Sequence, residues 1–467
     1  MAVESKFISE VRASLQLAVP LSALNLFNIA IGFVDTVMMG LLGSQILAAG
    51  ALGVVTFQTL IFISTGFVEG VTPLIAEAFG AGETDRISRV AAQGLWLTAA
   101  LSLPMMLLIW HLDSILSLLG QEESTVLSAK TYLRAIVWGF PAAIGFVVLK
   151  EVATALNQPQ FVTAVAFGGP FLNAGANYVL IFGKFGLPAL GLAGIGWAST
   201  LTFWVNFILA AGIVGFHIKF RDYQLVRHLH QFNKDLFVEV FQIGLPISLQ
   251  LAAEFGLLTV AALLMGRLGT TMLAANQIVV QTIDVAMMVS VGVGYAATAR
   301  VGQLKGANAL EGTKRAGLVA LVIGAVGMGI IALALWLFPE QIVAIYLDAN
   351  DPGNAEAVKA AISLLKVAAF FQLAYGLNLI AFSVLLGLKE TGLSALINIL
   401  AYWGIGLGGG YLLGFPLQKG GIGLWWGLTA GMGVATVLLI WRFYQVTTNP
   451  IDSTQDEEER SPRALVQ

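Results

Sequence analysis

Acidic side chains inside apolar segments are the residues of this chain best suited to do chemistry. Asp35, Glu254 and Asp284 each lie within a long apolar run. A carboxylate within a membrane span costs about 2.5 kcal/mol or more, so such a residue is a functional candidate by default. Because burial favours the protonated form of a carboxyl group, we expect these acids to exchange protons or to hold a hard cation such as Na⁺.

Asp35 ends a stripe of polar residues on one face of its segment. Asn25, Asn28, Gly32 and Asp35 stand at positions i, i+3, i+7 and i+10, which share one face of a helix. The stripe therefore predicts a polar surface that leads to the acid.

Asn173 and Asn177 stand at i and i+4 on one face of another apolar segment. With the stripe that ends at Asp35 they predict a small oxygen-rich pocket. Such a pocket suits either a proton on Asp35 or a Na⁺ ion held by Asp35, Asn173 and Asn177. The alternative is that the two amides only bridge helices by hydrogen bonds.

A second polar group surrounds Glu254. Gln250 lies one helical turn before it, and the next apolar segment carries Gln277, Gln281 and Asp284 at i, i+4 and i+7. We expect Glu254 and Asp284 to take part in ion coupling. Two alternatives stay open: a neutral Glu254 that is hydrogen-bonded across helices, and an Asp284 that only faces a polar lumen.

Tyr375 and Asn378 follow Gln372 at threefold spacing in a later apolar segment. Ordinary packing is the alternative role for such an aromatic side chain. The predicted substrate cavity is lined by Asn28, Gln250, Gln277, Gln281, Tyr375 and Asn378.

Other ionisable residues are interpreted as solvated. We expect Lys150, Glu151 and Lys366 to lie close enough to a membrane interface for their charges to reach water. His217, His228 and His230 lie in a basic connection, which we interpret as a solvated loop rather than a metal site.

The elements that must position these residues are membrane-spanning helices. Of the 467 residues, 57% are hydrophobic and only 11% are charged, and the mean hydropathy is +0.84. Soluble domains carry about 25% charged residues, so the chain is predicted to be an all-α polytopic membrane protein. Runs of roughly 20 apolar residues cross a bilayer. Twelve such runs are centred near residues 27, 60, 99, 138, 171, 203, 250, 285, 326, 372, 404 and 434.

The composition also excludes several classes of function. A net charge of −3 argues against a nucleic-acid partner. The absence of cysteine excludes disulfide bonds, thiolate metal sites and cysteine nucleophiles. Because the spans offer neither a pair of histidines nor two acids in one motif, we expect neither an enzyme nor a cofactor.

An internal repeat relates the two halves of the chain. A shift of 226 positions places residues 20–81 on residues 246–307 without a gap. A period this long indicates a duplicated domain, and such duplications build transporters whose binding site opens to either side of a membrane. The shift pairs Asp35 with Ala261, so the two halves are alike in fold and differ in their acids.

Lysine and arginine residues determine the predicted topology. They concentrate in connections that an even number of spans places in the cytoplasm together with both termini. Each repeat then holds six spans, and the two repeats run parallel. The predicted divisions are a cytoplasmic N-terminus at 1–13, six-helix lobes at 14–216 and 236–446, a cytoplasmic inter-lobe loop at 217–235 and a disordered tail at 447–467. We expect a bacterial inner-membrane protein that acts as a monomer in the lipid bilayer.

Several short motifs occur along the chain in a definite order. They are residues 34–43 (VDTVMMGLLG), 72–76 (TPLIA), 80–82 (GAG), 274–278 (AANQI), 296–302 (AATARVG), 387–391 (GLKET) and 402–406 (YWGIG). In this order, and over residues 10–446, the chain resembles the multidrug and toxic compound extrusion (MATE) family, in its NorM-like branch.

The resemblance implies a secondary antiporter that expels organic, often cationic, compounds in exchange for H⁺ or Na⁺. It assigns the coupling acids to Asp35 and Glu254, and the partners of Asp35 to Asn173 and Asn177. The chain departs from the family at two positions, because many relatives have aspartate in place of Asn177 and NorM-like relatives have aspartate in place of Tyr375. Both departures weaken a two-acid Na⁺ site, so protonation of Asp35 and Glu254 is the preferred coupling chemistry.

The sequence thus predicts a multidrug antiporter that works by alternating access. Ionised Asp35 and Glu254 would hold a lipophilic cation in a central cavity, and H⁺ or Na⁺ from outside would neutralise them and release it. The alternative is a flippase for lipid-linked saccharides of a related fold. Its anionic substrate would need Lys or Arg in the cavity, whereas the spans offer carboxylates and amides. An ion channel would only dissipate a gradient, so uphill transport separates it from an antiporter.

Overall fold

The computed structural model describes residues 2–118, 122–348 and 351–448. Within these ranges every regular element is helical and no β-strand occurs. The same ranges contain twelve helical segments long and apolar enough to cross a membrane, and each includes one predicted centre. The predicted all-helical fold with twelve spans is confirmed. The predicted tail lies, from residue 449 onward, outside the described residues.

Contacts between residues divide the chain into two compact units. The N-unit is Gln16–Ala252, and the C-unit consists of the described residues up to Leu15 together with those from Ala253 onward. Both boundaries fall inside helices. The predicted lobes, 14–216 and 236–446, instead follow the sequence repeat, and their boundaries stay a prediction.

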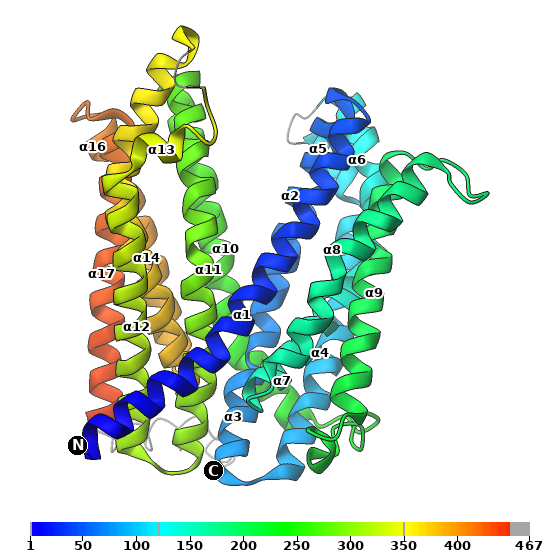
Figure 1. The fold of residues 1–467 in the computed structure, drawn as a ribbon, viewed down its shortest axis with the longest axis vertical. Helices are drawn as coiled ribbons and strands as arrows, with labels where there is room; N and C mark the ends of the chain where they lie inside the picture. Colours follow the sequence, from blue (N-terminus) through cyan, green and yellow to red (C-terminus); the bar gives the residue numbers. More distant parts are fainter. Residues whose placement is uncertain (1, 119–121, 349–350, 449–467) are drawn as a thin grey trace, which may run out of the picture. The chain divides into compact units, whose positions relative to one another are not determined.

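The first ten helical elements belong to the first sequence repeat. They are α1 (Ala2–Leu41), α2 (Ser44–Glu69), α3 (Val71–Ala81), α4 (Thr84–Trp110), α5 (Leu112–Leu118), α6 (Glu123–Ile136), the 3-10 helix η1 (Val137–Gly139), α7 (Phe140–Ala155), α8 (Pro159–Phe182) and α9 (Leu192–Phe216). Helices α8 and α9 run side by side (Figure 1), and α9 also packs against α6 and α7. A connection at residues 217–233, which contains the 3-10 helix η2 (Arg221–Tyr223), follows α9.

The remaining elements belong to the second repeat. They are α10 (Lys234–Arg267), α11 (Thr270–Gly306), α12 (Leu310–Leu337), α13 (Pro339–Val343), η3 (Pro352–Asn354), α14 (Ala355–Gly387), α15 (Gly392–Leu400), the π-helix η4 (Ala401–Gly408), α16 (Gly409–Gly414) and α17 (Gly420–Thr448). Helix α14 packs against α11, α12 and α17 and forms the centre of the C-unit core.

Helix boundaries repeat with the period of the sequence. The ends of α1 and α10, the starts of α2 and α11, and the starts of α4 and α12 are each 226 positions apart. Gly43 and Gly269, which precede α2 and α11, have φ angles of 112° and 117°. Only glycine adopts such angles readily, so matched glycines make the same sharp turn in both repeats.

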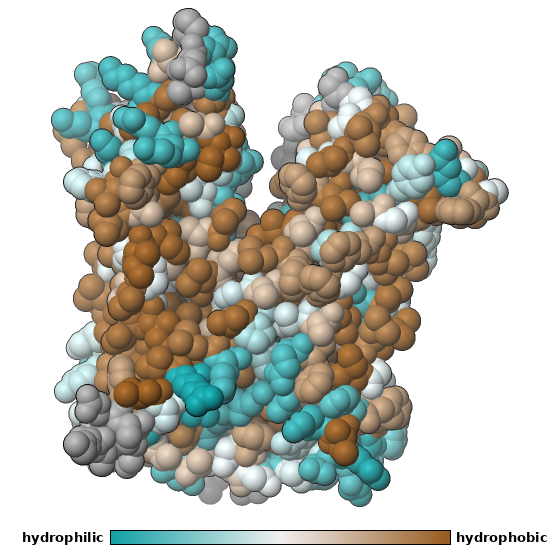
Figure 2. Space-filling view, in the orientation of Figure 1, coloured by the Kyte–Doolittle hydropathy of each residue, from teal (hydrophilic) through white to brown (hydrophobic). Residues whose placement is uncertain are grey.

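Apolar side chains cover the long sides of the helices, whereas hydrophilic side chains gather toward the helix ends (Figure 2). The exposed residues include Phe33 and Phe171 in the N-unit and Leu263 and Trp441 in the C-unit. Soluble monomers rarely expose contiguous apolar surfaces of this kind, so both units are built to face lipid.

Candidate functional site

Asp35 lies in the C-terminal part of α1, and only 4% of the residue is exposed. Asn177 on α8 donates a hydrogen bond from Nδ2 to Asp35 Oδ1 at 2.8 Å. Ser199 on α9 donates from Oγ to Asp35 Oδ2 at 2.7 Å. Each carboxylate oxygen therefore accepts a hydrogen bond from a neutral group, and three helices meet at this acid.

The amides of α8 extend this cluster. Asn177 Nδ2 also donates to Asn173 Oδ1 at 3.0 Å, and Asn173 Nδ2 donates to Ser199 Oγ at 3.2 Å. Among the described residues, Asn177 Oδ1 has no hydrogen-bond partner although it is buried. This oxygen is an acceptor that a protonated carboxyl group or a cation can use.

The structure thus brings together Asp35, Asn173 and Asn177, and it adds Ser199, which the sequence analysis missed. A single serine in an apolar segment has no distinguishing spacing, so no sequence signal could have found it. Tyr132 is 1% exposed and lies close enough to Asp35 to experience its charge. A Cβ at Gly53 would lie 2.7 Å from the Tyr132 ring, so this glycine leaves the space that the ring fills.

Glu254, on α10, accepts a hydrogen bond at Oε1 from the hydroxyl of Tyr375 on α14. The ring of Tyr375 packs against Phe371, one turn earlier, with ring centroids 5.4 Å apart. Phe371 in turn meets Trp425 edge-on at 5.1 Å. Aromatic packing therefore holds the tyrosine hydroxyl in a defined position against the acid.

The C-unit contains a further set of buried, hydrogen-bonded polar groups. Tyr402 donates from Oη to Asn378 Oδ1 at 2.6 Å, and Asn378 Nδ2 donates to Asn398 Oδ1 at 3.0 Å. Tyr402 belongs to the π-helix η4, a conformation that is frequent at functional sites. Asn398 has no distinguishing spacing in the sequence, so its bond to Asn378 was found only in the structure.

Asp284 on α11 is exposed, and its charge acts on Glu254. Two ionised carboxylates repel one another, so protonation of either acid relieves this repulsion. The residues of the predicted substrate cavity have mixed exposure. Asn28, Gln277 and Gln281 are exposed, Tyr375 is half-buried, and Gln250 and Asn378 are buried.

Lys150 and Glu151 on α7 do not reach an interface, so that interpretation was wrong. Their side chains are 6% and 1% exposed, and Lys150 Nζ lies 2.8 Å from Glu151 Oε1. Thr72 on α3 donates a hydrogen bond to the second carboxylate oxygen of Glu151. The ion pair with Lys150 and the threonine hydroxyl offset part of the cost of burying the Glu151 carboxylate.

Lys150→Leu should lower the free energy of unfolding by about 3–5 kcal/mol, because it leaves the buried carboxylate of Glu151 without its cation. The double variant Lys150→Leu/Glu151→Leu should recover most of that loss. Chemical unfolding in detergent measures both values. If Lys150→Leu is as stable as the parent protein, the ion pair does not contribute to the free energy of unfolding.

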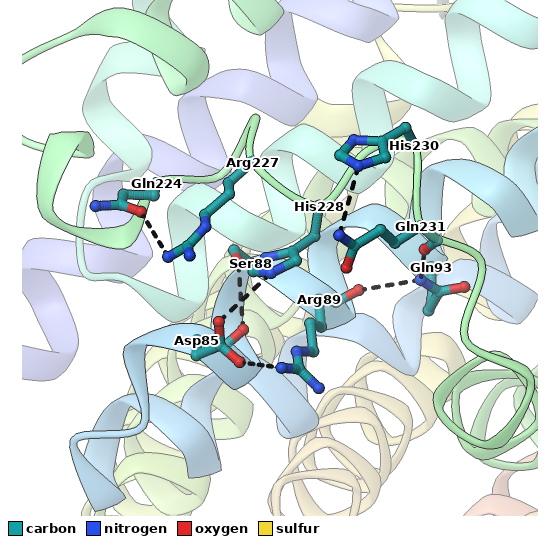
Figure 3. A network of polar contacts seen from close by, with 9 residues as sticks. All are labelled: Asp85, Ser88, Arg89, Gln93, Gln224, Arg227, His228, His230 and Gln231. Atoms are coloured by element: carbon teal, nitrogen blue, oxygen red, sulfur yellow. Dashed lines mark hydrogen bonds and ion pairs between the residues drawn. The ribbon is translucent and has the colours of Figure 1, made fainter.

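His228 is also buried, contrary to the expected solvated loop. It is 6% exposed, its Nδ1 lies 2.6 Å from Ser88 Oγ, and its Nε2 lies 3.5 Å from Asp85 Oδ1. Asp85 in turn pairs with Arg89 at 2.6 Å. Figure 3 shows the imidazole directed at α4 between these side chains.

The rest of the connection is bound along the same helix. Gln93 Nε2 donates to the carbonyl oxygen of Gln231 at 2.9 Å, and Gln93 Oε1 accepts from the backbone N–H of Asn233 at 3.1 Å. Trp96 Nε1 donates to the carbonyl oxygen of Leu229 at 3.1 Å. We call this interaction the α4 dock. It was missed because backbone groups of the connection, which carry no sequence signal, make most of its bonds.

Gln93→Leu should release the connection from α4. Two backbone groups of the connection would lose their partners, each at a cost of about 1–3 kcal/mol. We expect faster proteolysis at Arg227, which is exposed in the connection, as measured by limited digestion with trypsin. Gln224→Leu is the matched control, because the Gln224 side chain bonds the Arg227 side chain within the connection and not α4. Equal cleavage rates in both variants would contradict the dock.

Comparisons with known proteins agree on one family. A family model described as MatE matches residues 20–179 and 246–412. A protein named "Probable multidrug resistance protein NorM" from Synechocystis sp. is 40% identical over 438 residues, which cover 94% of this chain and 95% of the relative. The protein of the same name from Pseudomonas aeruginosa is 38% identical over 441 residues, which cover 94% of this chain and 90% of the relative.

Solved structures share the fold. The crystal structure of the eukaryotic MATE transporter AtDTX14 aligns with a TM-score of 0.85 at 21% identity, covering 97% of this chain and 99% of that chain. The Vibrio cholerae MATE transporter VcmN in the bent form aligns with a TM-score of 0.84 at 19% identity, covering 95% and 98%.

Proposed function

Because the chain belongs to the MatE family, in its NorM-like branch, we propose that it is an antiporter that expels organic cations in exchange for protons. Family membership and the NorM relatives make the chain a multidrug efflux transporter of small molecules and not an enzyme. It is a multi-pass protein of the bacterial inner membrane. The proposal concerns the coupling ion and the charge of the substrate.

The observation that carries the proposal is the hydrogen bonding of Asp35. Both carboxylate oxygens accept bonds from neutral donors, Asn177 Nδ2 and Ser199 Oγ. A Na⁺ ion at Asp35 would need several oxygen ligands, and Asn177 presents its Nδ2 rather than its Oδ1 to the carboxylate. A proton on Asp35 needs only one acceptor, and Ser199 Oγ, 2.7 Å away, can accept its hydrogen bond once the hydroxyl rotates. The arrangement therefore supports H⁺, and Na⁺ remains the alternative coupling ion.

The second acid site has a different design. Glu254 accepts the hydroxyl of Tyr375 and also experiences the charge of Asp284. A lipophilic cation is attracted by ionised carboxylates in a low-dielectric environment. Protonation removes that attraction. Competition between protons and substrate for Asp35, Glu254 and Asp284 is the proposed coupling, and the proton's differential affinity for the two conformations drives the exchange.

The proposed mechanism involves neither a lipid-linked substrate nor a cofactor. The flippase alternative is not favoured, because the two clusters consist of acids, amides and hydroxyl groups, whereas an anionic lipid-linked saccharide requires cationic partners. We propose that the protein functions as a monomer. We propose no organic cofactor, since a bound proton is sufficient.

Proteoliposomes with an imposed proton gradient test the proposal. We expect them to accumulate the fluorescent cation ethidium against its own concentration gradient, and to lose it when nigericin collapses the proton gradient. Transport that proceeds only downhill would overturn antiport. Accumulation that follows an imposed sodium gradient instead would replace H⁺ with the alternative ion.

A further inference from the structure

An arginine–glutamate pair joins the start of α1 to the end of α11. Arg300 donates from Nε to Glu10 Oε1 at 2.8 Å and from Nη2 to Glu10 Oε2 at 2.9 Å, which is a bidentate pair. Arg300 Nη1 also donates to Gln303 Oε1 at 3.2 Å. Glu10 is 5% exposed. Helix α1 belongs to the first sequence repeat and α11 to the second, so this pair connects the two repeats within the C-unit.

A second arginine–glutamate pair joins the repeats within the N-unit, and here the first repeat supplies the arginine and the second supplies the glutamate. Arg86 on α4 belongs to the first repeat, and its Nη2 lies 3.4 Å from Oε1 of Glu239 on α10, the first helix of the second repeat. Both side chains are 33% exposed, so this pair is more hydrated than the first.

The two pairs follow one plan. In each pair, the glutamate lies near the N-terminal end of a repeat's first helix. The arginine belongs to the other repeat and lies near the connection between its second and third spans: Arg300 on α11 before that connection, and Arg86 on α4 after it. The 226-residue shift places Glu10 on Leu236, one helical turn before Glu239. The acids therefore occupy neighbouring positions on equivalent helices although they do not align with each other.

Direct backbone contact accompanies the second pair. A Cβ at Gly244 on α10 would lie 2.1 Å from the carbonyl oxygen of Phe67 on α2, and a Cβ at Gly66 would lie 2.7 Å from the backbone nitrogen of Ser248. Glycine is required for this close approach of membrane helices. On α4, the α4 dock, in which His228 binds Ser88 (Figure 3) and Gln93 binds Asn233, fixes the chain immediately before α10.

We propose that the pairs Glu10–Arg300 and Arg86–Glu239 are latches that hold the two repeats together on the predicted cytoplasmic side and open once in each transport cycle. The proposal rests on alternating access, since repeats that rock apart on one side must break the contacts that join them there. The bidentate, charge-assisted Glu10–Arg300 pair is strong when closed, and the single Arg86–Glu239 contact is weaker. Ends of spans near water allow the separated charges to be hydrated again, which makes such a latch reversible.

Reversible cross-linking tests the latches directly, because the chain contains no cysteine that would need to be removed. The double variants Glu10→Cys/Arg300→Cys and Arg86→Cys/Glu239→Cys are joined by a short bis-methanethiosulfonate reagent in proteoliposomes. We expect each cross-link to slow ethidium counterflow about tenfold or more, a typical size for conformational coupling, and reductant to restore it. Counterflow needs no ion gradient, so the result does not depend on which ion couples transport.

Asp113→Cys/Lys130→Cys is the matched control, since this ion pair joins α5 and α6 within the first repeat. Its cross-link should leave counterflow unchanged. Charge reversal gives an independent readout: Glu10→Arg should alter the counterflow rate, and Glu10→Arg/Arg300→Glu should restore it. Cross-linked latches that exchange ethidium at the untreated rate, or a charge exchange that restores nothing, would overturn the proposal. Absence of counterflow in the untreated parent protein would instead count against the proposed function.

Discussion

Asp35→Asn should reduce proton-driven transport by roughly 10- to 100-fold, the range that corresponds to a lost coupling free energy of about 1–3 kcal/mol. Asparagine has nearly the same shape as aspartate and still accepts the bond from Ser199, but it cannot bind and release a proton. Folding should be unaffected, because the buried charge is removed rather than left unpaired. Ethidium accumulation in proteoliposomes with an imposed proton gradient measures the loss.

Ser199→Ala is the control for this variant. It removes one of the two hydrogen bonds to the Asp35 carboxylate, so it should slow transport without abolishing coupling. If Asp35→Asn accumulates ethidium as well as the parent protein does, the acid on α1 does not carry the coupled proton.

Glu254→Gln should have an effect of similar size, because it removes the titratable group of the C-unit cluster. Tyr375→Phe should slow transport by about tenfold, since a hydrogen bond to a charged group contributes about 1.5–3 kcal/mol. The two losses should not add, because the tyrosine acts through the glutamate that it contacts. Initial rates of proton-driven ethidium transport give both values and their combination.

Phe371→Leu separates packing from hydrogen bonding at this site. It loosens the ring that supports Tyr375 and leaves the hydroxyl in place, so its effect should be smaller than that of Tyr375→Phe. A double variant Glu254→Gln/Tyr375→Phe that loses the product of the two single effects would mean that the residues act independently.

More of the fold than of the candidate site could be predicted from the sequence. Long apolar runs must be helices in lipid, so the number of spans followed from hydropathy, and the 226-residue repeat reappears in the helix ends and in Gly43 and Gly269. The acids were found for a similar reason, since a charge in a span is rare enough to stand out. Helical spacing placed Asn173 and Asn177 on one face of their own segment, and the family resemblance supplied their pairing with Asp35.

Partners without a rare residue type or a regular spacing could not be predicted. Ser199 and Asn398 are ordinary polar residues in apolar segments, and only the packing of α9 and α15 brings them to the clusters. Lys150 and His228 were misread because their burial depends on tertiary partners, a carboxylate in one case and α4 in the other. A pattern along one segment carries no information about what another segment places opposite it.

Proton release on substrate binding tests the central claim most directly. Calorimetric titration of the detergent-solubilised protein with tetraphenylphosphonium, in buffers of different ionisation enthalpy, measures how many protons the cation displaces. Exchange of a proton for an organic cation at the acids predicts net proton release in the parent protein and less release in both Asp35→Asn and Glu254→Gln. Binding that releases no protons in the parent protein, with or without Na⁺ in the buffer, would contradict proton-coupled antiport.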